Sequence, residues 1–161
     1  MQIKIFTTGG TIDKTYFDGN SDYQVGEPQV GDILDKSNVV FDYTVNSVLK
    51  KDSLDIDDAD RQLIREAIAS DPATHIIITH GTDSMVKTAA ALADIADKTI
   101  VLTGSMSPAL FRDSDAVFNI GGSVIAAQLL PAGVYIVING KVFDPKHAKK
   151  NVAMKRYELN P

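Results

Sequence analysis

Two glycines and three threonines, TTGGT at positions 7–11, end the first apolar run of the chain. Glycine adopts backbone conformations with positive φ without steric cost, so a tight turn after a strand would account for the glycine pair. A turn does not require the last threonine, which makes Thr11 a candidate nucleophile, although a threonine hydroxyl needs a base or proton relay nearby. The alternatives are a turn without chemistry and an anion site built from backbone N–H groups. The segment lacks the spacing of glycine-rich nucleotide-binding motifs.

A second segment of the same kind, HGTDSM at positions 80–85, follows a later apolar run. Thr82 and Asp83 place a hydroxyl beside a carboxylate, and such a pair can orient a substrate and pass a proton. Asp83 can equally cap a helix that begins there, but capping does not require Gly81 and Thr82 before it. His80 is a candidate base, although a histidine at the end of a strand is more often structural.

Apolar runs alternate with amphipathic patterns along the chain, and these elements have to position both segments. Runs rich in valine and isoleucine predict strands at residues 2–7, 39–49, 75–79, 99–103 and 133–139. Apolar residues at helical spacing predict helices at residues 57–70, 83–96 and 115–130. The last helix contains Gly121 and Gly122, which cost it up to about 1 kcal/mol each. We expect such a pair to mark close packing against a sheet.

This alternation predicts an α/β fold in a single domain. Nearly continuous Val/Ile strands are typical of a mostly parallel sheet sandwiched by helices, a doubly wound three-layer arrangement of the flavodoxin or Rossmann kind. Ligands bind such sheets at the carboxyl ends of the strands. Glycine, hydroxyl and charged residues follow four of the predicted strands, so we expect them to gather on one edge.

Composition and charge limit the class of function. The 161 residues are 44% hydrophobic and 23% charged, as in an ordinary soluble domain. A net charge of −5 argues against a nucleic-acid partner. The absence of cysteine excludes thiolate metal sites and a cysteine nucleophile. The sequence has no secretory signal pattern and no apolar run near the ~18 residues of a membrane span, so we expect a cytoplasmic protein without membrane contact.

Four segments, in order along the chain, resemble the bacterial-type L-asparaginases and glutaminase-asparaginases. IFTTGGTID and ITHGTDSM are similar to that family's two specific motifs, T-G-G-T-I after a strand and T-H-G-T-D-T-M. VLTGSMSP is similar to V-x-x-G-A-M-R-P, and SDAVFNIGGSVIAA to the S-D-G-x-x-N helix that follows it. The resemblance covers nearly all of residues 1–161 and implies the family's N-terminal domain, without its usual C-terminal domain.

The resemblance implies roles for the residues that attack the substrate. The threonine that closes T-G-G-T implies Thr11 as nucleophile, with Gly10 beside it in the substrate pocket. DYQVG matches the family's N-Y-x-V-G loop and implies Tyr23 as a proton acceptor. That loop, from Asp13 to Pro28, contains Gly19, Asn20 and Gly26 and is expected to be a mobile lid. T-H-G-T-D implies Thr82 as the second hydroxyl.

The resemblance also implies the residues that hold the substrate. KKDSLDIDD aligns with the segment whose serine binds the α-carboxylate, which implies Ser53, and Asp83 is implied as the partner of the α-ammonium. Backbone N–H groups at Gly81 would stabilise an oxyanion. VFDPKHAKK matches the segment of the family's lysine and implies Lys150, with Lys149 as the alternative register.

The implied activity is hydrolysis of the side-chain amide of L-asparagine, or a related amide, through a threonine acyl-enzyme. It needs no metal or organic cofactor, and the implied assembly is a homodimer or a larger homo-oligomer. The sequence departs from the family in having Leu54 where secreted members carry glutamine. The expected absence of a second domain also leaves the pocket without its usual wall. The alternatives are therefore a non-catalytic module that binds an amino acid or amide, and a subunit that needs a partner domain.

Overall fold

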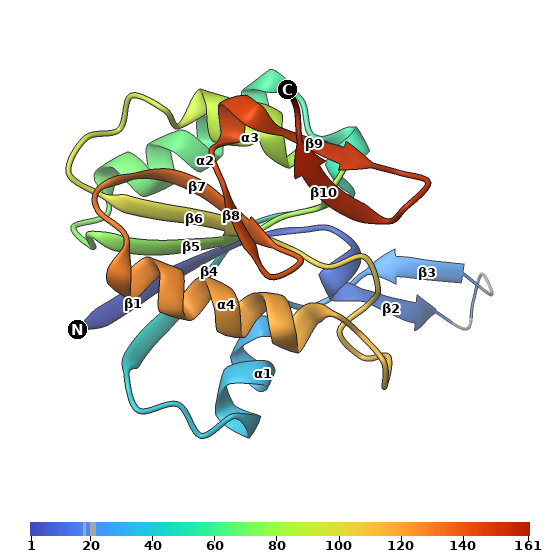
Figure 1. Cartoon of the computed structure of the whole chain (residues 1–161). Helices are drawn as coiled ribbons and strands as arrows, with labels where there is room; N and C mark the ends of the chain where they lie inside the picture. The colour runs from blue at the N-terminus through green and yellow to red at the C-terminus, as the bar shows by residue number, and fades with distance from the viewer. Residues whose placement is uncertain (18, 20–21) are drawn as a thin grey trace.

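A six-stranded sheet lies between two layers of helices, which confirms the predicted α/β fold (Figure 1). The computed structural model describes residues 1–17, 19 and 22–161. The sheet runs in the order β4 (Asp42–Lys51), β1 (Gln2–Gly9), β5 (His75–Thr79), β6 (Thr99–Thr103), β7 (Gly133–Ile138) and β8 (Lys141–Phe143). The first five strands are parallel, and β8 pairs antiparallel with β7.

The helices cover both faces of the sheet, which explains why the central strands β5, β6 and β7 are nearly continuous apolar runs. They are α1 (Val30–Lys36), α2 (Asp58–Ser70), α3 (Met85–Ala91) and α4 (Ala116–Leu129). In Figure 1, α2 and α3 lie on one face and α1 and α4 on the other. Ile76 and Ile78 of β5 pack in the core under α2 and α3, whereas Ile77 packs in the core under α1 and α4.

The strand order places the two hydroxyl-rich segments side by side. β1 lies between β4 and β5. After β1 the chain forms β4 on one side of it, and it then crosses to form β5 and the remaining strands on the other side. The crevice at such a reversal is where doubly wound sheets bind ligands. TTGGT spans the end of β1, and HGTDSM follows β5, so both segments border this crevice.

Some local predictions are wrong. The helix predicted at residues 83–96 ends at Ala91, where Arg65 of α2 donates a hydrogen bond to the Ala91 carbonyl at 3.1 Å. Helix α1 was not expected, because its apolar stripe is only two turns long. Of the glycine pair expected to pack against the sheet, Gly122 does so, since a Cβ added there would lie 3.7 Å from Val137 of β7, whereas a Cβ added to Gly121 would meet no atom within 4 Å.

Two hairpins stand outside the main sheet, and neither was predicted. The segment Asp13–Pro28, which was expected to be a mobile lid, contains an antiparallel pair, β2 (Lys14–Phe17) and β3 (Asp22–Val25). Residues 18, 20 and 21 of that segment lie outside the described residues. The second hairpin joins β9 (Ala148–Asn151) to β10 (Arg156–Leu159). Within the part of the chain that the structure describes, no helix has the length and apolar character needed to cross a membrane.

Candidate active site

The backbone of the TTGGT turn lies directly on that of the HGTD turn. Gly10 has φ of 85°, and a Cβ added to it would overlap the backbone nitrogen of Gly81. A Cβ added to Gly81 would stand 2.5 Å from the Cβ of Ser53. The N–H of Gly10 also donates to the Lys51 carbonyl at 2.9 Å. These contacts bring Thr11, which follows Gly10, next to the segments that carry Ser53 and Thr82.

Ser53 lies in a 3₁₀ turn after β4 and is 2% exposed. Its Oγ accepts a hydrogen bond from the backbone N–H of Asp83 at 3.2 Å, and its carbonyl accepts one from the Ser84 hydroxyl. Leu54, next in the chain, is 76% exposed and contributes no polar group. The Ser53 hydroxyl hydrogen is therefore the donor that this turn offers to a ligand.

Lys150 connects the two side chains that follow Gly81. Its Nζ donates to Thr82 Oγ1 at 2.8 Å and to Asp83 Oδ1 at 2.6 Å. Thr82 is buried, while the Lys150 and Asp83 side chains are 19% and 36% exposed. Lys149 faces away from this contact and is exposed. A buried hydroxyl beside an ammonium is a suitable proton relay, because the positive charge favours the deprotonated oxygen.

The hairpin of β9 and β10 positions Lys150 and adds a residue that sequence reasoning missed. Tyr157 lies directly opposite Lys150 in the antiparallel register, and its hydroxyl donates to the Thr82 carbonyl. Burial, with the negative charge of Asp83, raises the pKa of Tyr157 well above its usual range. The phenol therefore stays a hydrogen-bond donor and holds the Thr82 backbone. No spacing in the sequence relates this tyrosine to a residue 75 positions earlier.

His80 is a structural residue rather than the candidate base. Its side chain is fully buried, with Nδ1 donating to the Gly81 carbonyl and Nε2 accepting from Thr88 Oγ1, each at 2.7 Å. Burial lowers the pKa of His80 to about 4, so the ring is neutral at pH 7. Both nitrogens are occupied in fixing the turn that carries Thr82.

Tyr23 is the one predicted site residue that the structure leaves apart from the others. Its ring packs edge-on against Tyr16 and Phe111, with centroid distances of 5.7 Å and 5.4 Å. It is 45% exposed on β3. The structure thus brings together the turns that carry Thr11, Ser53, Thr82, Asp83 and Lys150, and places Tyr23 in an aromatic cluster at the surface.

Asp13 is a buried carboxyl two residues beyond Thr11, and sequence reasoning did not identify it. Its Oδ1 accepts from the N–H of Gln29 at 2.9 Å, and its carbonyl accepts from the N–H of Gly26 at 2.8 Å. Burial raises the pKa of Asp13 to about 7, against the opposing effect of the Gln29 hydrogen bond. Asp13 therefore fastens the end of the β2–β3 hairpin to the turn that carries Thr11.

Two ion pairs fasten the same hairpin to the end of β4. Lys14 Nζ lies 2.9 Å from Asp52 Oδ2, and Lys50 Nζ lies 2.5 Å from Glu27 Oε1. The Lys14 ammonium holds the pKa of Asp52 below its usual range. The stem of the hairpin is thus tied to the strand that leads to Ser53. Among the described residues, no group of three or more histidine, aspartate or glutamate side chains gathers as metal ligands would.

Comparison with known proteins gives a consistent family. A model of the asparaginase N-terminal domain matches residues 2–159. The chain is 32% identical over 164 residues to L-asparaginase 2 of Escherichia coli, covering 92% of this chain and 46% of that protein. It is 31% identical over 159 residues to one of the subunits of the glutamyl-tRNA(Gln) amidotransferase of Methanococcus vannielii, covering 88% of this chain and 35% of that protein.

The fold agrees with these sequence similarities. The thermostable L-asparaginase from Thermococcus kodakarensis superposes with a TM-score of 0.84 at 26% identity, over 99% of this chain and 51% of that one. The chain therefore spans about half or less of the length of the proteins it matches.

The contact between Gly81 and Ser53 gives the first testable prediction. Gly81→Ala places a methyl group 2.5 Å from the Ser53 Cβ, so the two turns must separate. We expect a loss of stability of roughly 1–3 kcal/mol in urea denaturation and a change in the environment of Ser53. Gly31→Ala on α1 is the control, because the nearest atom to its added Cβ is 4.0 Å away. Equal stability of the two variants would contradict the contact.

The buried carboxyl of Asp13 gives a prediction about pH. Its pKa in the folded state is about 7, above the ordinary value of 3.8, so the folded protein favours the neutral form. Below about pH 4 the carboxyl is neutral in both the folded and the unfolded protein, and Asp13 contributes its full stability. As the pH rises through about 7 the buried carboxyl has to ionise, and this contribution is lost. Asp13→Asn keeps an oxygen acceptor for Gln29 and cannot ionise. As the pH rises from 5 to 8, we therefore expect the unfolding free energy of Asp13→Asn to increase relative to that of the wild type by on the order of 2–4 kcal/mol.

The measurement is urea denaturation of both proteins at each pH, with the difference in unfolding free energy plotted against pH. The other carboxylates are common to the two proteins and cancel in that difference. A difference that stays flat from pH 5 to pH 8 would show that Asp13 ionises normally.

Proposed function

Because this chain belongs to the asparaginase family, we propose that it is an amidohydrolase that converts L-asparagine or a related amide to the acid and ammonia. The observation that carries the proposal is the contact of Lys150 Nζ with both Thr82 Oγ1 and Asp83 Oδ1, at the edge of the sheet where Thr11 lies. A surface lysine would not need a buried hydroxyl partner.

In the proposed reaction, Thr11 Oγ1 attacks the carbon of the side-chain amide. The carbonyl oxygen becomes an oxyanion, which backbone N–H groups at the Gly10 and Gly81 turns are suited to stabilise. The C–N bond then breaks, the nitrogen leaves as ammonia after taking a proton, and an ester remains on Thr11. Water attacks this ester, releases the carboxylic acid and returns the proton to Thr11.

The proton of Thr11 needs an acceptor, and Thr82 with Lys150 is the proposed relay. Thr82 Oγ1 takes the proton of Thr11 as it gives its own hydroxyl proton to the leaving nitrogen, and the Lys150 ammonium stabilises the negative charge that develops on Thr82 Oγ1 during this transfer. Tyr23 is a second proposed acceptor, and it would have to leave its contacts with Tyr16 and Phe111 to serve. The β2–β3 hairpin that carries Tyr23 would then move over the substrate as a lid.

The substrate's α-substituents have proposed partners on the same turns. The Ser53 hydroxyl would donate to the α-carboxylate. Asp83 uses Oδ1 for Lys150, so Oδ2 is the oxygen that we propose for the α-ammonium. The exposed side chain of Leu54 offers no hydrogen bond beside Ser53. We therefore propose that Ser53 alone holds the α-carboxylate end of the substrate.

A second candidate function is that of one component of a larger enzyme. One relative is named as part of an amidotransferase, and this chain covers 35% of its length. A non-catalytic module that binds an amino acid is the third candidate. Thermal stabilisation by asparagine or glutamine without ammonia release would favour a binding module. The expected cytoplasmic location stays a prediction.

Thr11→Ala tests the nucleophile. If the purified protein releases ammonia from asparagine, glutamine or a related linear amide, this variant should lose at least about 10³-fold in kcat/KM, because no other group can form the ester. Thr44→Ala is the matched control, since Thr44 is an exposed threonine on β4. Trapping of a substrate acyl group on Thr11 by mass spectrometry would support the mechanism, and full activity in Thr11→Ala would refute it.

Lys150→Met tests the relay and the register of the lysine. We expect a loss of about 10²–10⁴-fold in kcat, the usual contribution of a proton-transfer group. Lys149→Met removes an exposed neighbouring lysine and should leave kcat unchanged. The reverse result would assign the relay to Lys149 and would contradict the proposed role of the contact with Thr82.

A further inference from the structure

The hairpin of β9 and β10 is attached to the rest of the molecule through two of its residues. Lys150 and Tyr157 lie opposite each other on its two strands. Across the described part of the chain, they make every hydrogen bond that joins residues 145–161 to residues 1–140. The two strands form a sheet of their own, so the ladder of the main sheet does not extend to them. The place of Lys150 therefore depends on how Tyr157 is held.

Tyr157 is held by its side chain and by its backbone. The hydroxyl donates to the Thr82 carbonyl, and the ring packs against Phe143 of β8 with a centroid distance of 6.1 Å. The backbone N–H of Tyr157 donates to Asn139 Oδ1 at 2.8 Å. An N–H that points away from the partner strand marks a non-hydrogen-bonded pair, in which the opposite side chains lie closest. The Asn139 side chain thus occupies the outer edge of β10, beside the position of Lys150.

The turn between β7 and β8 fixes the backbone of Asn139. The turn consists of Asn139 and Gly140, with φ of 53° and 75°, as in the tight turn that Asn-Gly favours. Glycine would satisfy this turn equally well, because it adopts positive φ without steric cost. The turn therefore explains the backbone conformation of Asn139 but does not require the hydrogen bond from its side chain to Tyr157.

Asn119 of α4 supports Asn139 from within the core. Its Oδ1 accepts from the Asn139 N–H at 3.0 Å, while its Nδ2 donates to the Gly104 carbonyl at 2.9 Å and to Asp115 Oδ2 at 3.0 Å. Asn119 is 2% exposed, and a buried amide whose hydrogen bonds are satisfied is a rigid support. The contacts therefore continue from α4 through Asn139 to Tyr157.

We propose that Asn139 is a positioning residue for Lys150. Its side-chain oxygen holds the Tyr157 backbone, and with it the hairpin, at the place from which Lys150 reaches Thr82. The inference rests on the amide hydrolysis proposed above, in which Lys150 stabilises the charge that develops on Thr82. The net contribution of one hydrogen bond corresponds to a factor of about three to ten in an equilibrium constant. Loss of the Asn139 bond should therefore shift Lys150 away from Thr82 in a measurable fraction of the molecules.

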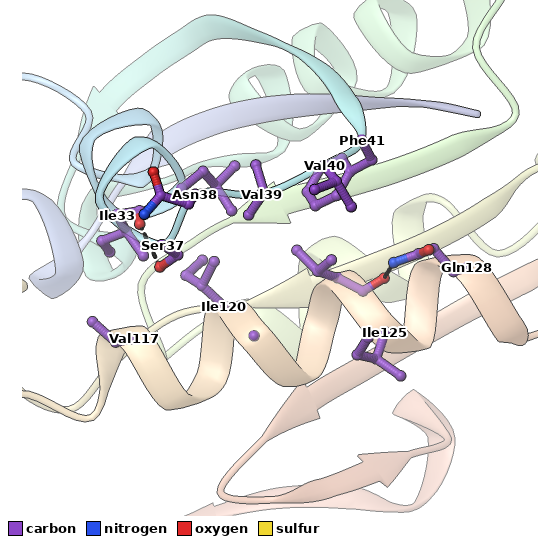
Figure 2. A pocket seen from close by; sticks show the side chains of 13 residues that line it. Ile33, Ser37, Asn38, Val39, Val40, Phe41, Val117, Ile120, Ile125 and Gln128 are labelled. Atoms are coloured by element: carbon purple, nitrogen blue, oxygen red, sulfur yellow. Dashed lines mark hydrogen bonds between the residues drawn. The ribbon is translucent and has the colours of Figure 1, made fainter.

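Two substitutions separate the side chain of Asn139 from the turn. In Asn139→Gly the backbone conformation is kept and the acceptor is lost, whereas in Asn139→Asp an oxygen remains for the Tyr157 N–H and the positive φ is tolerated. Asn38→Gly is the matched control, because Asn38 is another exposed asparagine, with φ of 48°. Figure 2 shows Asn38 just after α1, beside an apolar groove that none of the candidate site residues lines. Circular dichroism establishes that each variant is folded.

The kinetic measurement is ammonia release from the amide that the wild type hydrolyses. We expect Asn139→Gly to lower kcat about three- to tenfold and to change KM by less than about twofold, because Ser53 and Asp83 remain on their own turns. Asn139→Asp and Asn38→Gly should keep kcat close to that of the wild type. In a Lys150→Met background, Asn139→Gly should lower kcat no further, since the side chain that it positions is absent.

Acetylation of Lys150 measures the positioning without turnover. An ammonium bonded to Thr82 and Asp83 should react with a low dose of acetic anhydride more slowly than the exposed Lys149, and tandem mass spectrometry distinguishes the two lysines. We expect the ratio of Lys150 to Lys149 acetylation to rise about three- to tenfold in Asn139→Gly. It should stay at the wild-type value in Asn139→Asp and in Asn38→Gly.

Three results would overturn the role of Asn139. They are an unchanged acetylation ratio in Asn139→Gly, a loss of kcat in Asn139→Asp as large as that in Asn139→Gly, and an equal effect of Asn139→Gly with and without Lys150. Failure of the proposed function would appear differently, as the absence of ammonia release from every protein including the wild type. The acetylation ratio would then decide the positioning by itself.

Discussion

The candidate site depends on backbone contacts that leave no room for side chains. Gly10 lies on Gly81, Gly81 lies on Ser53, and a Cβ added to Gly104 would overlap the His80 carbonyl oxygen. Four turns, which follow the neighbouring strands β4, β1, β5 and β6, are therefore in close contact. Any other residue at these positions would separate the turns and move Thr11 from the hydroxyl and carboxylate beside it. The positive φ of Gly10 adds a second reason for glycine there.

A layer of buried polar groups keeps these turns in place. His80 bonds to Gly81 and Thr88, and Tyr157 bonds to the Thr82 carbonyl, so the HGTD turn is held from both sides. These supports are neutral, which avoids the large cost of burying charge. The charged pair of Lys150 and Asp83 keeps partial contact with solvent. Its desolvation is therefore modest, and its charges remain available to a proton or a substrate.

Local patterns in the sequence predicted the sheet, three of the helices and the turns that carry Thr11 and Thr82. These features are determined by short apolar runs and by glycine-rich segments, which act over a few residues. The hairpin of β9 and β10 could not be predicted, because its strands are only four residues long and its position depends on the distant contact of Tyr157 with Thr82. The buried carboxyl of Asp13 was also not predicted, because its surroundings include Gly26 and Gln29, which lie beyond the β2–β3 hairpin. The glycine pair of α4 was predicted to pack internally, and this holds for Gly122, which lies against Val137, but not for Gly121.

The two faces of α4 connect the candidate site to the exterior of the molecule. On the buried side, Asn119 holds Gly104, while Asp115 at the start of the helix accepts hydrogen bonds from the N–H groups of Met106 and Ser107. The same loop reaches the segment next to Thr11, where the N–H of Ala109 donates to the Ile12 carbonyl at 3.0 Å. The helix therefore uses its polar residues to fix a loop beside Thr11 and leaves apolar residues outside.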